Sequence, residues 1–375
     1  MLDTISRDLG VSEAAAGQVA GLFSLGICVT GPVLGALTSR YQRRSVLAAS
    51  LVLMGLGHAA AALAPDFGSL LAVRVLTSAA ASLFTPQAAA TASLLVPLDR
   101  RARTMAYVFL GWSVAAVVGL PAGAWLGKQL GWRAVMWIIT ALAALATAWV
   151  LWRVPSGLFT GRIDASAWRE LARHPVLLRV VSVTVLHATA QFALFSFIVV
   201  AFREALSAPA HLVTALLCLN GMAGFLGNIY AGRIADRIGP APVIAGSIAA
   251  MFAGFVVWIG IFAAGPGSLG IALAVLAALL WGGGNFGANS MQQVRLVNHA
   301  PPLAAVSVAL NTSAIYLGQF IGTALGGLVL TQHWSSPPSL ALPWLGLPIF
   351  ALAIAVSVSA QRREERAHPG AVRSS

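Results

Sequence analysis

Long apolar stretches separated by short polar segments run along the whole chain. A helix needs roughly 20 apolar residues to cross about 30 Å of hydrocarbon, because its backbone polar groups must bond within the segment. On this basis the sequence predicts an all-α integral membrane protein. Eleven membrane-spanning helices are predicted, at 14–37, 45–64, 69–95, 105–127, 134–152, 178–202, 211–231, 242–264, 268–291, 304–330 and 343–360.

Composition narrows the class of protein further. Only 9% of the 375 residues are charged and 58% are hydrophobic, whereas a soluble domain carries about 25% charged residues. The chain has too few charges to cover a water-facing surface, so the lipid bilayer is its expected environment. The net charge of +12 does not predict a nucleic-acid partner, because the basic residues are not gathered on one element.

The distribution of Lys and Arg predicts the orientation in the membrane. If the loop after the first span is cytoplasmic, alternation places 18 of the 23 basic residues inside, Arg295 among them, and four outside. Cytoplasmic loops of membrane proteins carry such an excess of basic residues. The start of the chain is therefore predicted outside and its end inside. One basic residue, Arg74, lies within a span.

The longest polar stretch, residues 154–177, follows the fifth span and precedes the last six. It is predicted to be a cytoplasmic linker between two bundles, or a short helix on the membrane surface. Four parts follow from this division: an N-terminal helical bundle, the linker, a C-terminal six-helix bundle and a cytoplasmic tail, at 1–153, 154–177, 178–361 and 362–375.

Two similar loop segments lie 197 residues apart, beginning at Gly35 and Gly232. Both follow an apolar span and both are cytoplasmic by the charge argument. Similar elements on the same side of the membrane, half a chain apart, predict a parallel repeat of two bundles. Six spans follow the linker and five precede it, so the repeat predicts that the N-terminal bundle lacks its first helix.

Small residues are spaced along two further spans of the repeat. Such residues make a flat helical face on which another helix can lie closely. The predicted helix-packing positions are Gly119, Pro121 and Gly123 in the first half and Gly318 and Gly322 in the second.

The repeated loop resembles the signature loop of the major facilitator superfamily, Gly-x-Leu-x-Asp-Arg-x-Gly-Arg-Arg. The first copy departs from it, with Ser39 in place of Asp and Gln42 in place of Gly. The remaining motif residues are Gly35, Leu37, Arg40, Arg43 and Arg44 in the first copy, and Gly232, Asp236, Arg237 and Gly239 in the second.

Other segments are similar to the drug, sugar and metabolite efflux branch of that family. Val73-Arg74 resembles its arginine motif, residues 119–123 its Gly-x-Pro motif, and Gly131-Trp132-Arg133 the start of its sixth helix. The opening segment from Asp8 resembles the sequence that follows the first helix in such proteins. The resemblance covers essentially the whole chain.

The resemblance implies a monomeric secondary transporter in a bacterial inner membrane, which exchanges a small molecule for protons by alternating access. A non-transporting truncated protein and an uptake permease of the same fold stay open as alternatives. The coupling and gating residues implied are Arg74, Asp236, Arg237, Arg40, Gly35, Gly232 and Gly239. For the loop residues, the simpler reading is that they shape a turn and orient the protein.

Polar amides within the second-half spans are candidates for a substrate cavity, although for each one taken alone a hydrogen bond between helices is the preferred interpretation. These residues are Gln191, Asn220, Asn285, Asn289 and Asn311. His58 and His187 lie within spans and titrate near neutral pH when unperturbed. The sequence carries no pattern typical of a catalytic triad, a phosphate loop or a metal site, so neither an enzyme nor a cofactor is predicted.

Overall fold

A computed structural model describes residues 2–97, 111, 114–159, 169–170, 173–299 and 304–367 of the chain. All regular structure within these ranges is helical. The chain divides into two compact units, Met1–Ala165 and Ser166–Ser375. The predicted linker at 154–177 spans this division.

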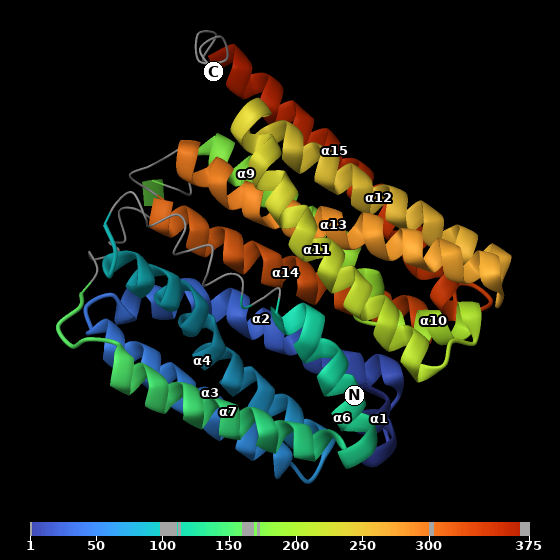
Figure 1. Ribbon diagram of the computed structural model, residues 1–375, viewed down its shortest axis with the longest axis horizontal. Helices are drawn as coiled ribbons and strands as arrows, with labels where there is room; N and C mark the ends of the chain where they lie inside the picture. The colour runs from blue at the N-terminus through green and yellow to red at the C-terminus, as the bar shows by residue number, and fades with distance from the viewer. Residues whose placement is uncertain are drawn as a thin grey trace. The chain divides into compact units, whose positions relative to one another are not determined.

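Unit 1 is built on long helices (Figure 1), two of which, α2 and α4, begin at a side-chain cap. The Ser12 hydroxyl accepts from the Ala15 amide, and Asp66 and Ser69 cap each other in a capping box. Such side chains satisfy backbone amides that have no partner within the helix. The elements of unit 1 are α1 (Leu2–Leu9), α2 (Glu13–Thr38), α3 (Arg43–Ala62), α4 (Phe67–Leu94), the π-helical turn η2 (Ala115–Gly119), α6 (Leu120–Leu130) and α7 (Trp132–Arg153).

Unit 2 contains one helix more than unit 1 within the described residues. The break at Ser196 and Phe197 divides the predicted span 178–202 into two helices. The elements of unit 2 are α9 (Pro175–Phe195), α10 (Ile198–Leu206), α11 (Ala210–Ile238), α12 (Pro240–Ala264), α13 (Ser268–His299), α14 (Ala304–Thr331), η4 (Pro338–Leu340) and α15 (Ala341–Ala367).

The two units use the same pattern of helix pairs. In unit 1, α4 packs against α2 and α3, and α3 packs against α7. In unit 2, α13 packs against α11 and α12, and α12 packs against α15. In addition, α9 packs against α14 and α15. The two halves are therefore pseudo-symmetric, and α9 has no counterpart among the described elements of unit 1.

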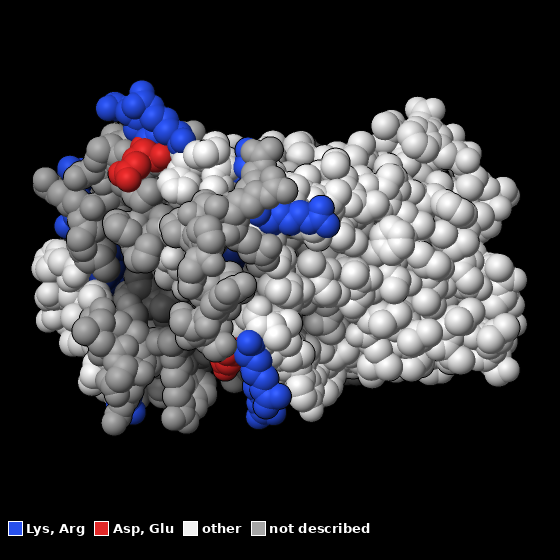
Figure 2. Space-filling view, turned by 90° about the horizontal axis from the view of Figure 1, so that it is seen from above, with Lys and Arg blue, Asp and Glu red and all other residues white. Residues whose placement is uncertain are grey.

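Ten helices of the described residues are long and apolar enough to cross a membrane. The eleventh predicted span, 105–127, falls largely outside the described residues, although η2 and α6 include its second half. Exposed apolar side chains are common on these helices: Leu76 is 74% exposed and Trp152 is 67% exposed. Much of the face in Figure 2 carries no charged side chain. Such a surface suits contact with lipid.

The structure corrects the expected ends of two spans. The eighth long helix, α13, continues to His299, so Arg295 is not the loop residue that the charge count made it. Its side chain is fully buried. The helix α11 continues to Ile238, so Asp236 and Arg237 lie in its last turn. The sequence prediction ended each of these spans where polar residues begin. In the structure both helices continue through those polar residues.

Candidate functional site

The charged side chain within the apolar part of unit 1 is that of Arg74, on α4. Its guanidinium lies over the ring of Phe23 on α2, 4.1 Å from the ring centroid. Its Nη1 lies 3.4 Å from Nε2 of His58 on α3. A cation over an aromatic face is stabilised by the ring quadrupole. Three helices thus hold Arg74 inside the bundle, and no carboxylate bonds to it among the described residues.

The imidazole of His58 is oriented by its own helix. Its Nδ1 lies 2.7 Å from the Met54 carbonyl oxygen, and a carbonyl can only accept, so Nδ1 carries the proton. The other nitrogen, Nε2, then accepts from Arg74. This arrangement requires a neutral imidazole. Protonating Nε2 would place a second donor, and a second positive charge, against the guanidinium.

The interior of unit 2 holds a hydrogen-bonded polar cluster shared by three helices. The Thr184 hydroxyl of α9 donates to Oδ1 of Asn311 on α14 over 2.6 Å. Nε2 of Gln292 on α13 donates to that hydroxyl over 3.2 Å and to the Val180 carbonyl oxygen over 3.0 Å. All three side chains are buried. The cluster therefore ties α9, α13 and α14 together through polar groups.

Several atoms of this region are buried without a hydrogen-bond partner. They include Asn311 Nδ2, Gln292 Oε1, Gln191 Oε1 and both ring nitrogens of His187. Unpaired polar groups in an apolar interior are costly, and at functional sites they commonly await water or a ligand. On α9, His187 lies one turn from Thr184 and one turn from Gln191, which places the three on one face.

Two other predicted cavity residues, Asn285 and Asn289, lie on the same face of α13 as Gln292. Asn285, Asn289, Gln292 and Arg295 follow one another at spacings of four, three and three residues, which is one helix face. Asn289 Nδ2 donates to Asn285 Oδ1 over 3.0 Å, and Asn289 Oδ1 has no partner. Asn220 is different, because its Nδ2 donates to the Ala278 carbonyl oxygen over 3.2 Å, a bond between α11 and α13.

The predicted small-residue face is used in unit 2. A Cβ added at Gly318 would lie 2.5 Å from the Val185 carbonyl oxygen, and one added at Gly322 would lie 2.9 Å from the Ala193 amide nitrogen. These contacts bring α14 against α9. In unit 1, Gly119 is exposed, and among the described residues a Cβ there would meet only Ala115, while Pro121 is buried and Gly123 half-buried.

The first copy of the repeated loop is anchored by Arg43. Its guanidinium donates to Gln87 Oε1 on α4 and, over 2.7 Å, to the Ser39 carbonyl oxygen. Its backbone amide donates to the Leu158 carbonyl oxygen over 2.9 Å. Arg43 is fully buried, whereas Arg40 is exposed and stacks over the ring of Tyr41. Gly35 meets no atom within 4 Å of an added Cβ.

The second copy presents its charges to the surroundings. Asp236 and Arg237 are exposed in the last turn of α11, and an added Cβ at Gly232 would meet no described atom within 4 Å. Gly239 joins α11 to α12 with a φ of 82°, in the left-handed region that glycine adopts without strain. The loop geometry itself therefore requires this glycine.

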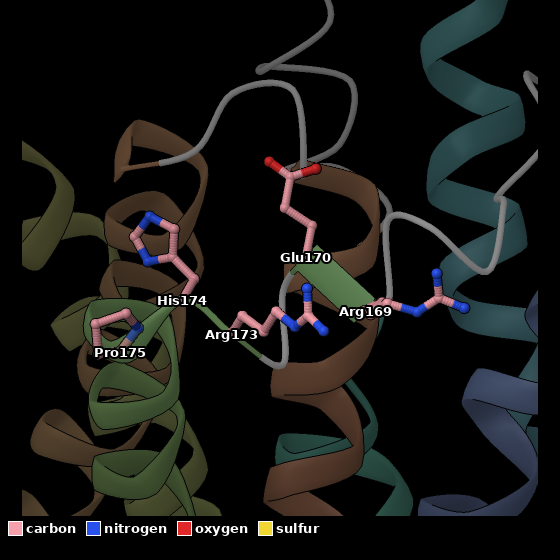
Figure 3. A pocket seen from close by; sticks show the side chains of 5 residues that line it. All are labelled: Arg169, Glu170, Arg173, His174 and Pro175. Atoms are coloured by element: carbon pink, nitrogen blue, oxygen red, sulfur yellow. The ribbon is translucent and has the colours of Figure 1, made fainter.

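Surface depressions are separate from these clusters. One of about 400 Å³ is lined by the start of α9 and the segment before it (Figure 3). Its side chains, among them Arg169, Glu170 and His174, point in different directions and do not converge on one point. Within the described part of the chain, no group of three or more His, Cys, Asp or Glu side chains is placed to hold a metal ion.

Comparison with models of protein families shows to which family the chain belongs. Residues 1–323 match the family model described as Major Facilitator Superfamily. The chain belongs to the Major Facilitator Superfamily. A solved nucleoside transporter of this fold, NupG, superposes with a TM-score of 0.72 at 14% identity, covering 96% of this chain and 94% of that chain. A bacterial homologue of the human lysosomal transporter Spinster gives 0.64 at 18% identity, covering 95% and 89%.

Relatives by sequence are transport proteins. The inner membrane transport protein YdhP of Escherichia coli is 28% identical over 371 residues, 97% of this chain and 92% of that protein. A chloramphenicol resistance protein of Streptomyces lividans is 32% identical over 253 residues, 65% of this chain and 63% of that protein. A chloramphenicol efflux pump of Mycobacterium tuberculosis is 28% identical over 358 residues, 94% and 86%. The protein is a multi-pass inner membrane member of the superfamily.

Sequence reasoning missed two residues of the polar face of α13, Gln292 and Arg295, and it missed Gln87, the partner of Arg43. Gln292 and Arg295 extend the spacing of Asn285 and Asn289 along α13, so the helical period was a signal that could have found them. Arg43 and Gln87 gave no such signal. They lie 44 residues apart and meet only through the packing of α3 and α4.

Proposed function

We propose that the protein is a secondary active transporter that exports a small molecule in exchange for protons by alternating access. The pairing of Arg74 with His58 inside unit 1 carries the proposal. An ionisable residue within a membrane span is costly and marks ion or substrate pathways. The family membership and the relative named an inner membrane transport protein support transport, and the relative named a chloramphenicol efflux pump supports export.

His58 is the proposed proton-binding group. The neutral imidazole accepts from Arg74, so protonation of Nε2 and the contact with Arg74 exclude each other. Of the ionisable groups on the helices packed against α3, Arg74 of α4 faces the imidazole, and Arg133 and Arg153 lie in the end turns of α7. Proton binding would thus release the guanidinium from α3, which is a two-state change of the kind that alternating access needs.

The polar cluster of unit 2 is the proposed substrate-binding region. It offers donors and acceptors without a negative charge, from Gln191, Gln292, Asn289 and Asn311. Such a set suits a neutral, hydrogen-bonding amphiphile. Chloramphenicol has this chemistry, and one relative is named a chloramphenicol efflux pump and another a chloramphenicol resistance protein, so this drug is the first probe to test.

The test uses everted membrane vesicles containing the full chain, acidified inside by respiration and loaded with a pH-sensitive dye. Export from the cell corresponds to uptake into these vesicles, so chloramphenicol should enter while protons leave and the dye signal recovers. His58→Gln keeps hydrogen bonding and removes titration, so the dye response should disappear while drug binding to the purified protein persists. Arg74→Met should abolish both uptake and dye response.

The matched control is Arg169→Gln, an exposed arginine outside both clusters. A dye response of wild-type size in His58→Gln would overturn the assignment of the proton site. Proton-driven entry of the drug into right-side-out vesicles, with none into everted vesicles, would show that the protein is an uptake permease and not an exporter. The absence of exchange in both orientations, with chloramphenicol and with a panel of neutral antibiotics, would overturn the transport proposal itself.

A further inference from the structure

The short helix α1 is held to the first turn of α7 by a carboxylate. Asp8 Oδ2 accepts from Trp132 Nε1 over 2.9 Å and from the Arg133 guanidinium. Arg133 Nη2 also donates to the Ala64 carbonyl oxygen over 3.0 Å, which adds the turn between α3 and α4. The hydrogen bond from Trp132, followed by that from Arg133, holds the pKa of Asp8 below its ordinary value. Beneath this contact, Ile5 of α1 packs with Trp132 and Met136.

A second carboxylate, that of Glu204, joins a short helix of unit 2 to the turn before its last long helix. Glu204, on the short helix α10, accepts through Oε2 from the Ser339 amide over 3.0 Å and from the Ser339 hydroxyl over 2.6 Å. Ser339 is fully buried and lies in η4, the turn that leads into α15. Phe202 and Leu206 of α10 and Leu342 of α15 belong to one apolar cluster. The polar contact again lies over apolar packing.

The two contacts occupy equivalent positions in the repeat. Each acid lies on the short helix that directly precedes α2 or α11, the two helices that correspond by their packing against α4 and α13. Asp8 binds the first turn of α7, and Glu204 binds η4, the turn that leads into α15, so each acid contacts the start of the last long helix of its unit. Because the repeated loops follow the far ends of α2 and α11, both acids lie at the end of their bundle opposite those loops. The match is one of position and contact, since the donors differ.

The chemistry favours a carboxylate at both places. A helix N-terminus carries unpaired amides and a positive partial charge, so an acid beside it is stabilised. In this fold, alternating access moves one bundle against the other as a body. A bundle moves as one body only if its helices stay joined at their ends. A contact between the acid and the last helix supplies that joint.

We propose that Asp8 and Glu204 are equivalent positioning residues, one in each bundle, which fasten the end of the bundle's last helix so that the bundle moves as one body. The inference rests on the proposed transport function for its kinetic part. The residues do not touch the clusters that hold His58 or Asn311. Their loss should therefore slow the conversion between states and leave substrate affinity unchanged.

The experiment compares Asp8→Asn, Glu204→Gln and the double variant of the full chain, with Lys128→Gln as an exposed control on α6 at the same end of unit 1. Amide hydrogen exchange is measured first on the purified protein. Exchange should rise roughly tenfold in residues 131–136 for Asp8→Asn and in 337–342 for Glu204→Gln, since each turn loses a charge-assisted bond. Each variant should leave the other unit's turn unchanged.

Transport of chloramphenicol in everted vesicles is measured second. Each single variant should lower the maximal rate several-fold with KM within about twofold, and the two losses should multiply, because distant sites act independently. Asp8→Glu should restore the rate, since it restores the charge. Unchanged exchange in either turn overturns the inference directly. Raised exchange with a wild-type maximal rate, or a loss confined to KM, also overturns it. If wild type transports nothing while exchange changes as expected, the failure lies in the proposed function.

Discussion

Thr184→Val tests the polar cluster of unit 2 by removing one hydroxyl at nearly constant volume. The change deletes two hydrogen bonds, the 2.6 Å bond to Asn311 Oδ1 and the 3.2 Å bond from Gln292 Nε2. Gln292 keeps its bond to the Val180 carbonyl oxygen. Asn311 keeps none, because its Nδ2 already has no partner. The loss therefore falls mainly on one buried amide.

The magnitude follows from these contacts. A hydrogen bond between membrane helices contributes about 0.6 kcal/mol on average and about 1.7 at most. An unsatisfied buried polar group costs about 1–3 kcal/mol. Because Asn311 becomes unpaired at both polar atoms, we expect Thr184→Val to lower the unfolding free energy by about 1.5 kcal/mol. The coupling between Thr184→Val and Asn311→Leu in a double-mutant cycle should be about 1 kcal/mol.

Reversible unfolding in mixed detergent micelles measures this free energy, extrapolated linearly with denaturant fraction. The matched control is Thr147→Val on α7, a buried threonine whose hydroxyl donates to the Ala143 carbonyl oxygen of its own helix. That change should cost under about 0.5 kcal/mol, since no partner on another helix is left unpaired. Equal effects of Thr184→Val and Thr147→Val, or a cycle with zero coupling, would refute the reasoning.

Three further predictions concern packing, an interior arginine and pH. Gly322→Ala should destabilise the protein by about 1–3 kcal/mol, because its Cβ would overlap the α9 backbone. The control is Gly232→Ala, which has open space around it among the described residues and should be neutral or stabilising. Thermal melts of both variants measure the difference. Arg43→Ala should lower thermal stability more than Arg40→Ala, since Arg43 is buried and bonded to α4 and Arg40 is exposed; equal shifts would count against that anchor. The pKa of Asp8 is lowered by folding, so its contribution is present above the ordinary value of 3.8 and is lost as pH falls through the lower folded value. The protection of residues 131–136 from hydrogen exchange, taken relative to the intrinsic rate at each pH, should therefore fall at acid pH in wild type and stay low at all pH values in Asp8→Asn.

The sequence by itself determined the helices and their repeat. Apolar length fixes where a chain can cross a bilayer, since an unpaired backbone group in hydrocarbon is too costly. The spacing of Gly35 and Gly232 predicted two similar halves, and the matching helix pairs of the two units confirm that the halves are alike. The helix-packing role of the glycines of α14 could also be predicted from the sequence, because a small-residue face depends on local spacing alone.

The tertiary structure decided which polar residues meet. Arg43 and Gln87, Thr184 and Asn311, and Asp8 and Trp132 are each separated by 44 residues or more. No local period brings such residues together. Their contacts depend on which helix face turns inward when three helices pack at once. For the same reason Arg295, which ends an apolar stretch in the sequence, lies buried within α13 instead of in a loop.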